Sequence, residues 1–219
     1  MRETIKQAVL DIINVHESVL TNRLLSGRFS PKVFTELFEL DDDEIHEYLA
    51  DNEHTPAEIL EKLATSEWPC PCLVAQNVAL PLETLVKLSE DSDLYWCVLQ
   101  NPNLPTEIIE KIYNDLLHYD LKNLPPFIDR DEFDTMFEFI IVHPNVSHTA
   151  FIGGFDYIVK HGIFDLCDRS EEYKIDCVNK ITANADRLLA DHACTAREQY
   201  RLIKVKNRLI SDLNKDAET

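Results

Sequence analysis

Asn101-Pro-Asn-Leu-Pro105-Thr-Glu107 is the last of three similar segments in the first half of this 219-residue chain. The other two are Asn52-Glu-His-Thr-Pro56-Ala-Glu58 and Asn77-Val-Ala-Leu-Pro81-Leu-Glu83. Counted from Pro31, the prolines are 25, 25 and 24 residues apart. A period this short predicts a repeat protein, because one such unit cannot bury its own apolar face and must stack on its neighbours.

Each repeat is expected to contain a short helix, a turn with the asparagine, and a second helix that begins at the proline. Proline suits the first turn of a helix, where the N–H that it lacks would have no intrahelical partner. Apolar residues follow Pro56 at helical spacing, at Ile59, Leu60 and Leu63. Thr55 and Glu58 match the capping-box pattern.

The repeated asparagines are expected to bond to nearby backbone in the turn before the second helix. The alternative is that asparagine is present only because it tolerates unusual turn conformations. A later repeat is recognisable at Ile141-Val-His-Pro-Asn-Val146, where the spacing stretches to 42 residues. This spacing places an insert at about residues 113–139, and insertions in repeat proteins often lie on the binding face.

The stretch from Asp93 to Ile112 resembles the leucine-rich repeat variant family, whose repeats of about 24 residues share an Asn-Pro-x-x-Pro-x-Glu core. The resemblance covers roughly residues 28–160. It implies an all-α fold in which α and 3₁₀ helices alternate in a right-handed superhelical solenoid. Some family members carry a cysteine cluster before the repeats. No cysteine precedes Cys70 here, so we expect no iron–sulfur cluster.

We expect one continuous domain, because the chain has only four glycines and no long polar linker. A capping helix is predicted over residues 1–27, the repeats over 28–160 and a helical cap over 161–219. Within the last of these, one helix is predicted from about 170 to 189. Another is signalled by the capping box Thr195-Ala-Arg-Glu198. Gly153-Gly154 is expected to separate two helices.

The chain is strongly acidic, with a formal net charge of −19, which disfavours nucleic-acid binding. Eight carboxylates and no Lys or Arg lie between Glu39 and Glu53, whereas six bases and two acids lie between Arg197 and Lys215. The acidic run is either solvated helix surface or a face for a basic partner. Because neither a membrane-spanning run nor a signal peptide is recognisable, we expect a cytoplasmic protein.

No phosphate loop or nucleophile motif occurs, so we expect neither catalysis nor a cofactor. His143 and His148 flank the fourth repeat turn and serve either as caps or as a general base. The acidic segment at 129–134 lacks the glycine and the final glutamate of a calcium loop, so a helix N-terminus is expected there.

The six cysteines are expected to be reduced thiols, because no secretion signal precedes them. The favoured interpretation is that these thiols are buried in the repeat core, and the alternative is that they bind a metal. Two groups of side chains would supply such a site. The first is Cys70, Cys72 and Cys97 with His54; the second is Cys167, Cys177 and Cys194 with His192.

Together these features predict a non-catalytic scaffold that binds another protein or peptide of basic character. The alternatives are a nucleic-acid mimic that occupies a basic DNA-binding protein, and a metal or thiol protein. Tyr95 and Trp96, with Trp68, are either core residues or aromatic anchors in a binding groove. The candidate binding residues are Asp42, Asp43, Glu47, Tyr95, Trp96 and Phe127.

Overall fold

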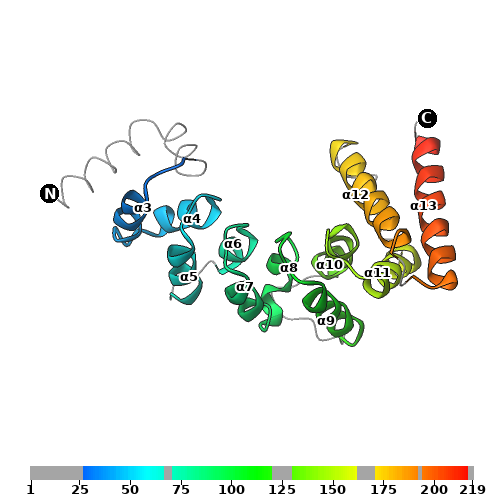
Figure 1. Ribbon diagram of the computed structural model, residues 1–219, viewed down its shortest axis with the longest axis horizontal. Coiled ribbons are helices and arrows are strands. Elements are labelled where there is room, and N and C mark those ends of the chain that lie inside the picture. Colours follow the sequence, from blue (N-terminus) through cyan, green and yellow to red (C-terminus); the bar gives the residue numbers. More distant parts are fainter. Residues whose placement is uncertain (1–26, 67–70, 120–129, 162–170, 192–193, 217–219) are drawn as a thin grey trace. The chain divides into compact units, whose positions relative to one another are not determined.

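The computed structural model describes residues 27–66, 71–119, 130–161, 171–191 and 194–216 (Figure 1). Every regular element in these ranges is a helix, which confirms the all-α prediction. No helix among them is long and apolar enough to cross a membrane. The chain divides into two compact units, Met1–Asn101 and Pro102–Thr219. The predicted N-terminal capping helix lies almost entirely outside the described residues.

The first unit contains helices in two rows. One row is α4 (Asp43–Asp51), α6 (Pro71–Gln76) and α8 (Tyr95–Val98), the last preceded by a 3₁₀ turn at Ser92–Leu94. The other row is α3 (Pro31–Phe38), α5 (Ala57–Thr65) and α7 (Leu82–Leu88). Neighbours within each row are in contact, and Figure 1 shows α6 above α7. The core between the rows is built from Phe34, Leu49, Leu60, Val74, Leu85 and Val98.

Pro56, Pro81 and Pro105 are N-cap residues, so their helices begin one residue later than the sequence predicts. Pro31, in contrast, is the first residue of α3, as predicted. Pro56 precedes α5 and Pro81 precedes α7, and neither cap has a side-chain hydrogen bond. The predicted capping box at Thr55 is therefore wrong. Thr55 is buried, and its hydroxyl has no hydrogen-bond partner among the described residues. It occupies the position that the buried Leu80 holds in the next repeat.

Asn77 links its own repeat to the preceding one. Its Nδ2 donates to the carbonyl of Ala50 at 2.6 Å and to that of Asn52 at 3.0 Å. Its Oδ1 accepts the N–H of Ala79 at 2.8 Å. The bond to Ala79 is the expected turn-forming bond. The two bonds to the earlier repeat were not predicted. They give the carbonyl of Ala50 a donor and that of Asn52 a second donor besides the N–H of Thr55.

The other two asparagines also donate to backbone carbonyls about 25 residues earlier in the chain. Asn101 donates to the carbonyls of Ala75 and Asn77 at 2.8 and 2.9 Å. Asn52 donates to Gly27 O at 3.1 Å. All three asparagines are buried, so these bonds are shielded from water and would be costly to lose. We call Asn52, Asn77 and Asn101 the asparagine ladder.

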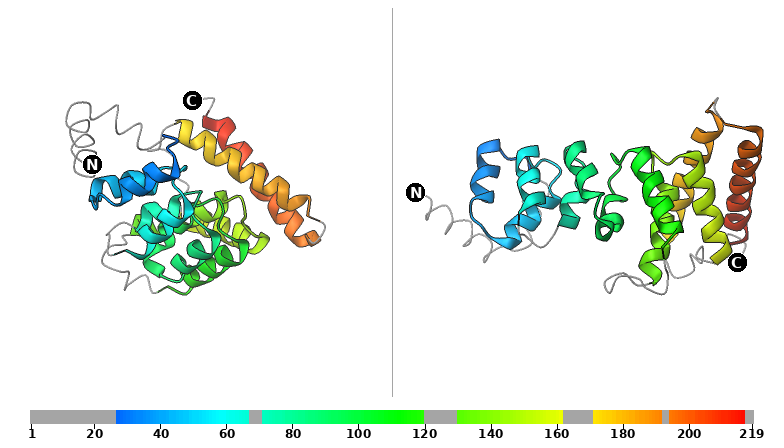
Figure 2. Two further views of the ribbon diagram at one scale, coloured as in Figure 1. Left: turned by 60° about the vertical axis from the view of Figure 1, so that its left-hand side comes forward. Right: turned by 90° about the horizontal axis from the view of Figure 1, so that it is seen from below.

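The described residues of the second unit contain five helices, also in two rows. The helices α9 (Thr106–Leu117), α11 (His148–His161) and α13 (Ala196–Asp216) form one row, and α10 (Arg130–Val142) and α12 (Glu171–Leu189) form the other. The two longest, α12 and α13, run side by side (Figure 2). The start of α10 confirms the helix N-terminus expected at 129–134. The core contains Phe133, Phe137, Ile141, Phe151, Ile158 and Ile181.

Both helices predicted in the C-terminal part are present. The one expected at 170–189 is α12, and the capping box before α13 is formed. Thr195 Oγ1 accepts the N–H of Glu198 at 3.3 Å, and the Glu198 carboxylate accepts the N–H of Thr195 at 2.8 Å. The Thr195 hydroxyl also donates to the Glu198 carboxylate at 2.6 Å. This bond and, after it, the one from the Thr195 N–H lower the pKa of the Glu198 carboxyl, because they stabilise its charged form.

His143 occupies the asparagine position of its repeat and makes the equivalent turn bond. Its Nδ1 accepts the N–H of Asn145 at 3.1 Å, as Asn77 Oδ1 does for the N–H two residues later. Asn184 then donates to the carbonyls of Ile141 and His143, both at 3.0 Å. His143 is buried, which supports its role as a cap.

Gly153 and Gly154 lie inside α11, so the expectation that they separate two helices is wrong. They are needed for close packing. A Cβ at Gly154 would lie 2.9 Å from Ile141 Cγ2, and one at Gly153 would overlap the Tyr113 hydroxyl and lie 2.6 Å from its Cζ. The two glycines therefore let α11 approach α10 and α9.

Replacing Gly153 with alanine is expected to lower the free energy of unfolding by about 1–3 kcal/mol through overpacking. This loss would outweigh the roughly 1 kcal/mol by which alanine favours a helix over glycine. Urea unfolding followed by circular dichroism measures the change. Adding Tyr113→Phe removes the nearest atom, so the double variant should recover part of the loss. Equal losses with and without Tyr113→Phe would contradict this explanation.

Candidate functional site

The acidic run predicted from the sequence forms one exposed face of α4. Asp43, Glu47 and Asp51 are all exposed and lie four residues apart, so they share one side of the helix. The opposite side buries Ile45 and Leu49 in the repeat core. We call Asp43, Glu47 and Asp51 the acidic stripe.

Asp42, also a predicted binding residue, has a structural task. It is the N-cap of α4, and its Oδ1 accepts the N–H of Ile45 at 3.2 Å. Such a cap contributes about 1 kcal/mol to helix stability. Asp41 beside it has a φ of 55°, a left-handed conformation that aspartate tolerates better than most residues. The main role of Asp42 is therefore to cap the helix that carries the acidic stripe, and its carboxylate is less available to a partner.

The acidic stripe is unfavourable for the isolated helix. Like charges four residues apart repel one another by about 0.2–0.5 kcal/mol per pair. Asp51 adds a negative charge to the last turn, where the helix dipole is already negative. The chain thus holds three carboxylates on one face of α4 at some expense of its own stability.

The two predicted aromatic residues that the structure describes, Tyr95 and Trp96, do not form a shared surface. Tyr95 is only 4% exposed and packs in the core, which matches the core alternative. Trp96 is half-buried in the same helix, α8, and its carbonyl accepts the Gln100 side chain at 3.1 Å. Phe127 and Trp68 lie outside the described residues. Of the predicted anchors that are described, only Trp96 has accessible surface to offer.

Cys72 and Cys97 form a disulfide, contrary to the expectation of reduced thiols. They are 25 residues apart, which is one repeat, so stacking of α6 on α8 brings equivalent positions within bonding distance. Their Cα atoms are 5.1 Å apart, an ordinary separation for a disulfide. Because both sulfurs are used, neither is left for the metal site considered for this pair.

The second cysteine group is only partly described. Cys177 and Cys194 are free and buried, and burial raises the pKa of both thiols. Cys70, Cys167 and His192 lie outside the described residues. His54 Nε2 accepts a hydrogen bond from Arg28 Nε at 3.1 Å. Within the described ranges, no group of three or more His, Cys, Asp or Glu side chains is placed to hold a metal ion.

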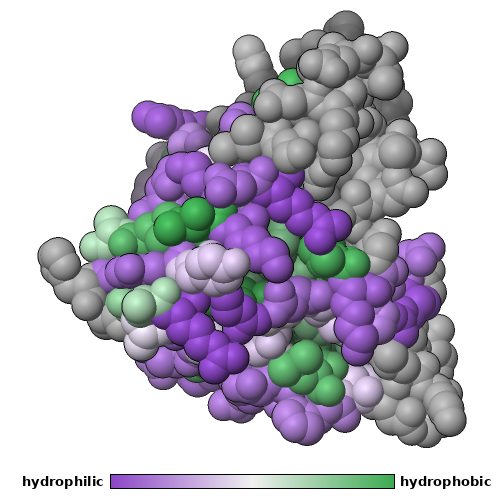
Figure 3. Space-filling model, turned by 90° about the vertical axis from the view of Figure 1, so that its right-hand side faces the viewer, coloured by the Kyte–Doolittle hydropathy of each residue, from purple (hydrophilic) through white to green (hydrophobic). Residues whose placement is uncertain are grey.

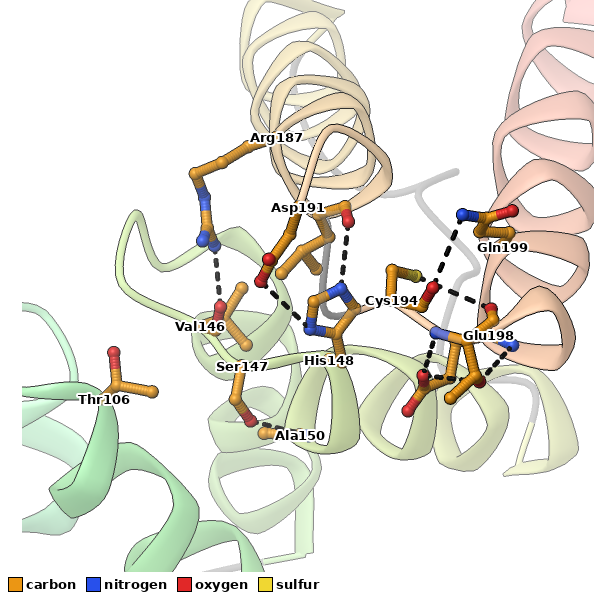
Figure 4. A network of polar contacts seen from close by, with 12 residues as sticks. Thr106, Val146, Ser147, His148, Ala150, Arg187, Asp191, Cys194, Glu198 and Gln199 are labelled. Carbon is orange, nitrogen blue, oxygen red and sulfur yellow. Dashed lines mark hydrogen bonds and ion pairs between the residues drawn. The ribbon is translucent and has the colours of Figure 1, made fainter.

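His148, the other candidate histidine, ties α11 to α12. Its Nε2 donates to the carbonyl of Leu188 at 2.9 Å, and its Nδ1 lies 4.0 Å from the Asp191 carboxylate. Beside it, Arg187 donates to the carbonyl of Val146 at 2.6 Å, and burial lowers the pKa of its guanidinium. Figure 4 shows both side chains reaching between the two helices. These contacts give His148 a structural role.

A groove between α11 and α13 was not predicted from the sequence. Its first part is a pocket of about 320 Å³ lined by Phe155, Val159, Tyr200, Lys204, Val205 and Arg208, together with Asp156 and Arg201. The second part, of about 410 Å³, shares Asp156 and Arg201 and adds Tyr113, His148, Gly153 and Glu198. Figure 3 looks onto the side that carries α13 and shows apolar surface between hydrophilic side chains. We call this feature the α11–α13 groove.

The α11–α13 groove contains an ion pair and a buried phenol. Arg201 forms an ion pair with Asp156 across the two helices. Burial raises the pKa of the Tyr113 phenol, and the negative charge of Asp156 adds to the shift. Tyr113 therefore stays protonated at neutral pH and offers a hydrogen-bond donor. The basic run from Arg197 onward was the one sequence signal that pointed to this region.

No family model, curated protein or solved structure matches this chain. The function proposed below accordingly depends on the residues of the chain itself.

Proposed function

We propose that this protein is a non-catalytic scaffold that binds a basic protein or peptide segment through the acidic stripe. The observation that carries the proposal is the exposure of Asp43, Glu47 and Asp51 along one side of α4, whose other side is anchored in the repeat core. A rigid charged face loses little conformational freedom on binding, which favours affinity.

The electrostatics of α4 support this proposal. Repulsion within the acidic stripe weakens the free protein, and cations from a partner would relieve it. Complementary charge also accelerates the encounter and selects against acidic partners. The repeat period and the asparagine ladder support a solenoid, which is the arrangement that the family resemblance implies. In such a solenoid, successive repeats would extend the binding face beyond α4.

The variant Glu47→Gln/Asp51→Asn is expected to be more stable than the wild type and to bind the basic partner more weakly. Its free energy of unfolding should rise by about 0.5–1 kcal/mol, because repulsion and the unfavourable dipole contact are removed. Affinity capture from a lysate of the native host, at low and moderate salt, should retain less of the partner than the wild type does. Asp42 stays intact, so the cap is preserved.

The matched control is Glu58→Gln/Glu61→Gln on α5, which removes the same charge from another exposed helix. Equal retention by both variants would contradict the proposal, since net charge alone would then govern binding. Retention of mainly DNA-binding proteins would favour the nucleic-acid mimic instead.

A further inference from the structure

The first pocket of the α11–α13 groove has an apolar floor. Phe155 from α11 and Val205 from α13 are each 5% exposed, and the half-buried Val159 continues the floor along α11. The volume of about 320 Å³ lies at the lower end of the range for ligand pockets. A space of this size accepts a large side chain of a peptide more readily than a whole cofactor.

The rim of the same pocket is basic. Arg201, Lys204 and Arg208 line it and share one side of α13, since they are spaced by three and four residues. Arg201 is paired with Asp156, whereas no acidic group among the described residues lies within ion-pair distance of Lys204. A basic rim is unexpected in a chain of net charge −19. Its charge is opposite to that of the acidic stripe.

An exposed aromatic residue stands at the rim. Tyr200 lines the pocket and is 68% exposed, the largest exposed fraction among the described bulky apolar side chains. Exposed tyrosine beside arginine is the composition found where protein interfaces gain most of their binding energy. The floor, the cations and Tyr200 thus lie together on two adjacent helices of one unit.

We propose that the α11–α13 groove binds an acidic peptide segment of a partner protein. One apolar side chain of that segment occupies the pocket between Phe155 and Val205. A flanking Asp or Glu residue pairs with Lys204, and the positive charge of Arg208 adds to the attraction. This site goes beyond the acidic stripe, because it selects a partner of the opposite charge and lies in the other unit.

Charge complementarity decides against other occupants. A basic peptide would be repelled by Lys204 and Arg208. Nucleic-acid binding depends on neutralising many successive phosphates, whereas Arg201, Lys204 and Arg208 are the cations among the residues that line this pocket. An acidic segment with one apolar anchor satisfies both the floor and the rim, through hydrophobic burial and charge-assisted hydrogen bonds.

Selection from a random peptide library displayed on phage, with the full-length protein as bait, tests the proposal. We expect enrichment of sequences in which Asp or Glu flank one aromatic or large aliphatic residue. The best of these is then synthesised with a fluorescent label, and its Kd is measured by anisotropy. Failure to enrich such acidic sequences would overturn the proposal, even if basic sequences that fit the acidic stripe are enriched.

Two variants locate the binding on the α11–α13 groove. Lys204→Glu should raise the Kd of the labelled peptide by about tenfold or more, because it replaces a charge-assisted bond with repulsion. Val159→Trp should abolish binding by filling the pocket. Arg197→Glu is the matched control, with the same charge change at an exposed residue of α13 that does not line the pocket. An equal loss in Arg197→Glu, or none in Lys204→Glu, would place the peptide elsewhere. Circular dichroism verifies that each variant is folded.

Discussion

Replacing Asn77 with aspartate is expected to lower the free energy of unfolding by about 3–5 kcal/mol, although the two side chains have nearly the same shape. The substitution removes both donors to the carbonyls of Ala50 and Asn52. It also places a carboxylate against those two oxygens in a buried site, where each unsatisfied polar group costs about 1–3 kcal/mol. The acceptor for the N–H of Ala79 is retained.

Urea unfolding of the full-length protein at neutral pH measures this loss. In acid the deficit should shrink, because a protonated carboxyl can donate one of the two missing bonds. Asn179→Asp is the matched control, since Asn179 is exposed on α12 and the same atoms are exchanged there. If both variants unfold at the same urea concentration, the asparagine ladder does not stabilise the stacking of repeats.

Reduction of the Cys72–Cys97 disulfide is expected to destabilise the first unit by about 3–4 kcal/mol. The estimate follows from the chain entropy that closing a loop across 25 residues removes from the unfolded state. Unfolding with and without a thiol reductant gives the difference. The double variant Cys72→Ala/Cys97→Ala should match the reduced protein and show no response to the reductant.

A wild-type protein that unfolds identically in both conditions would contradict the stabilising role of this disulfide.

The same pair of cysteines also tests whether the protein is cytoplasmic, as the sequence predicts. Disulfides are rare in the reducing cytosol. Alkylation of free thiols in intact cells, followed by mass spectrometry, should find Cys72 and Cys97 alkylated if the protein is cytoplasmic.

Local signals in the sequence predicted the helices well. The spacing of the prolines and of the apolar residues after them depends only on neighbours in the chain, so the second helices were placed within one residue. The predictions for Thr55 and Gly153 were made from local rules, and both are wrong. Pro56 takes the cap that Thr55 would have provided, and Gly153 is retained because Tyr113 leaves no room for a Cβ.

The bonds between repeats were not predictable in the same way. The pattern indicated that Asn77 would bond to its own turn, which is local, but not that it would reach Ala50, 27 residues earlier. That choice of acceptor depends on how one repeat stacks on another. The repeat period did suggest that Cys97 would lie near Cys72, but the sequence alone gave no reason to expect a bond between them.

The candidate sites differ in the same respect. Exposure of Asp43 and Glu47 follows from helical periodicity, whereas Tyr95 and Trp96 were harder to assign. The helix that carries them has only four residues, too few for a pattern to fix which side is buried. The α11–α13 groove brings together Asp156 and Arg201, which are 45 residues apart, so no local pattern could reveal it.

The asparagine ladder has a direction. Asn77 donates only backwards, to carbonyls of residues 50 and 52, and Asn101 likewise to those of residues 75 and 77. On the ribosome, where the N-terminal part of a chain emerges and folds first, each acceptor pair is therefore complete before its donor is made. Each new repeat can therefore pack on a repeat that has already folded as it leaves the exit tunnel. None of these hydrogen bonds requires a segment that is still being translated.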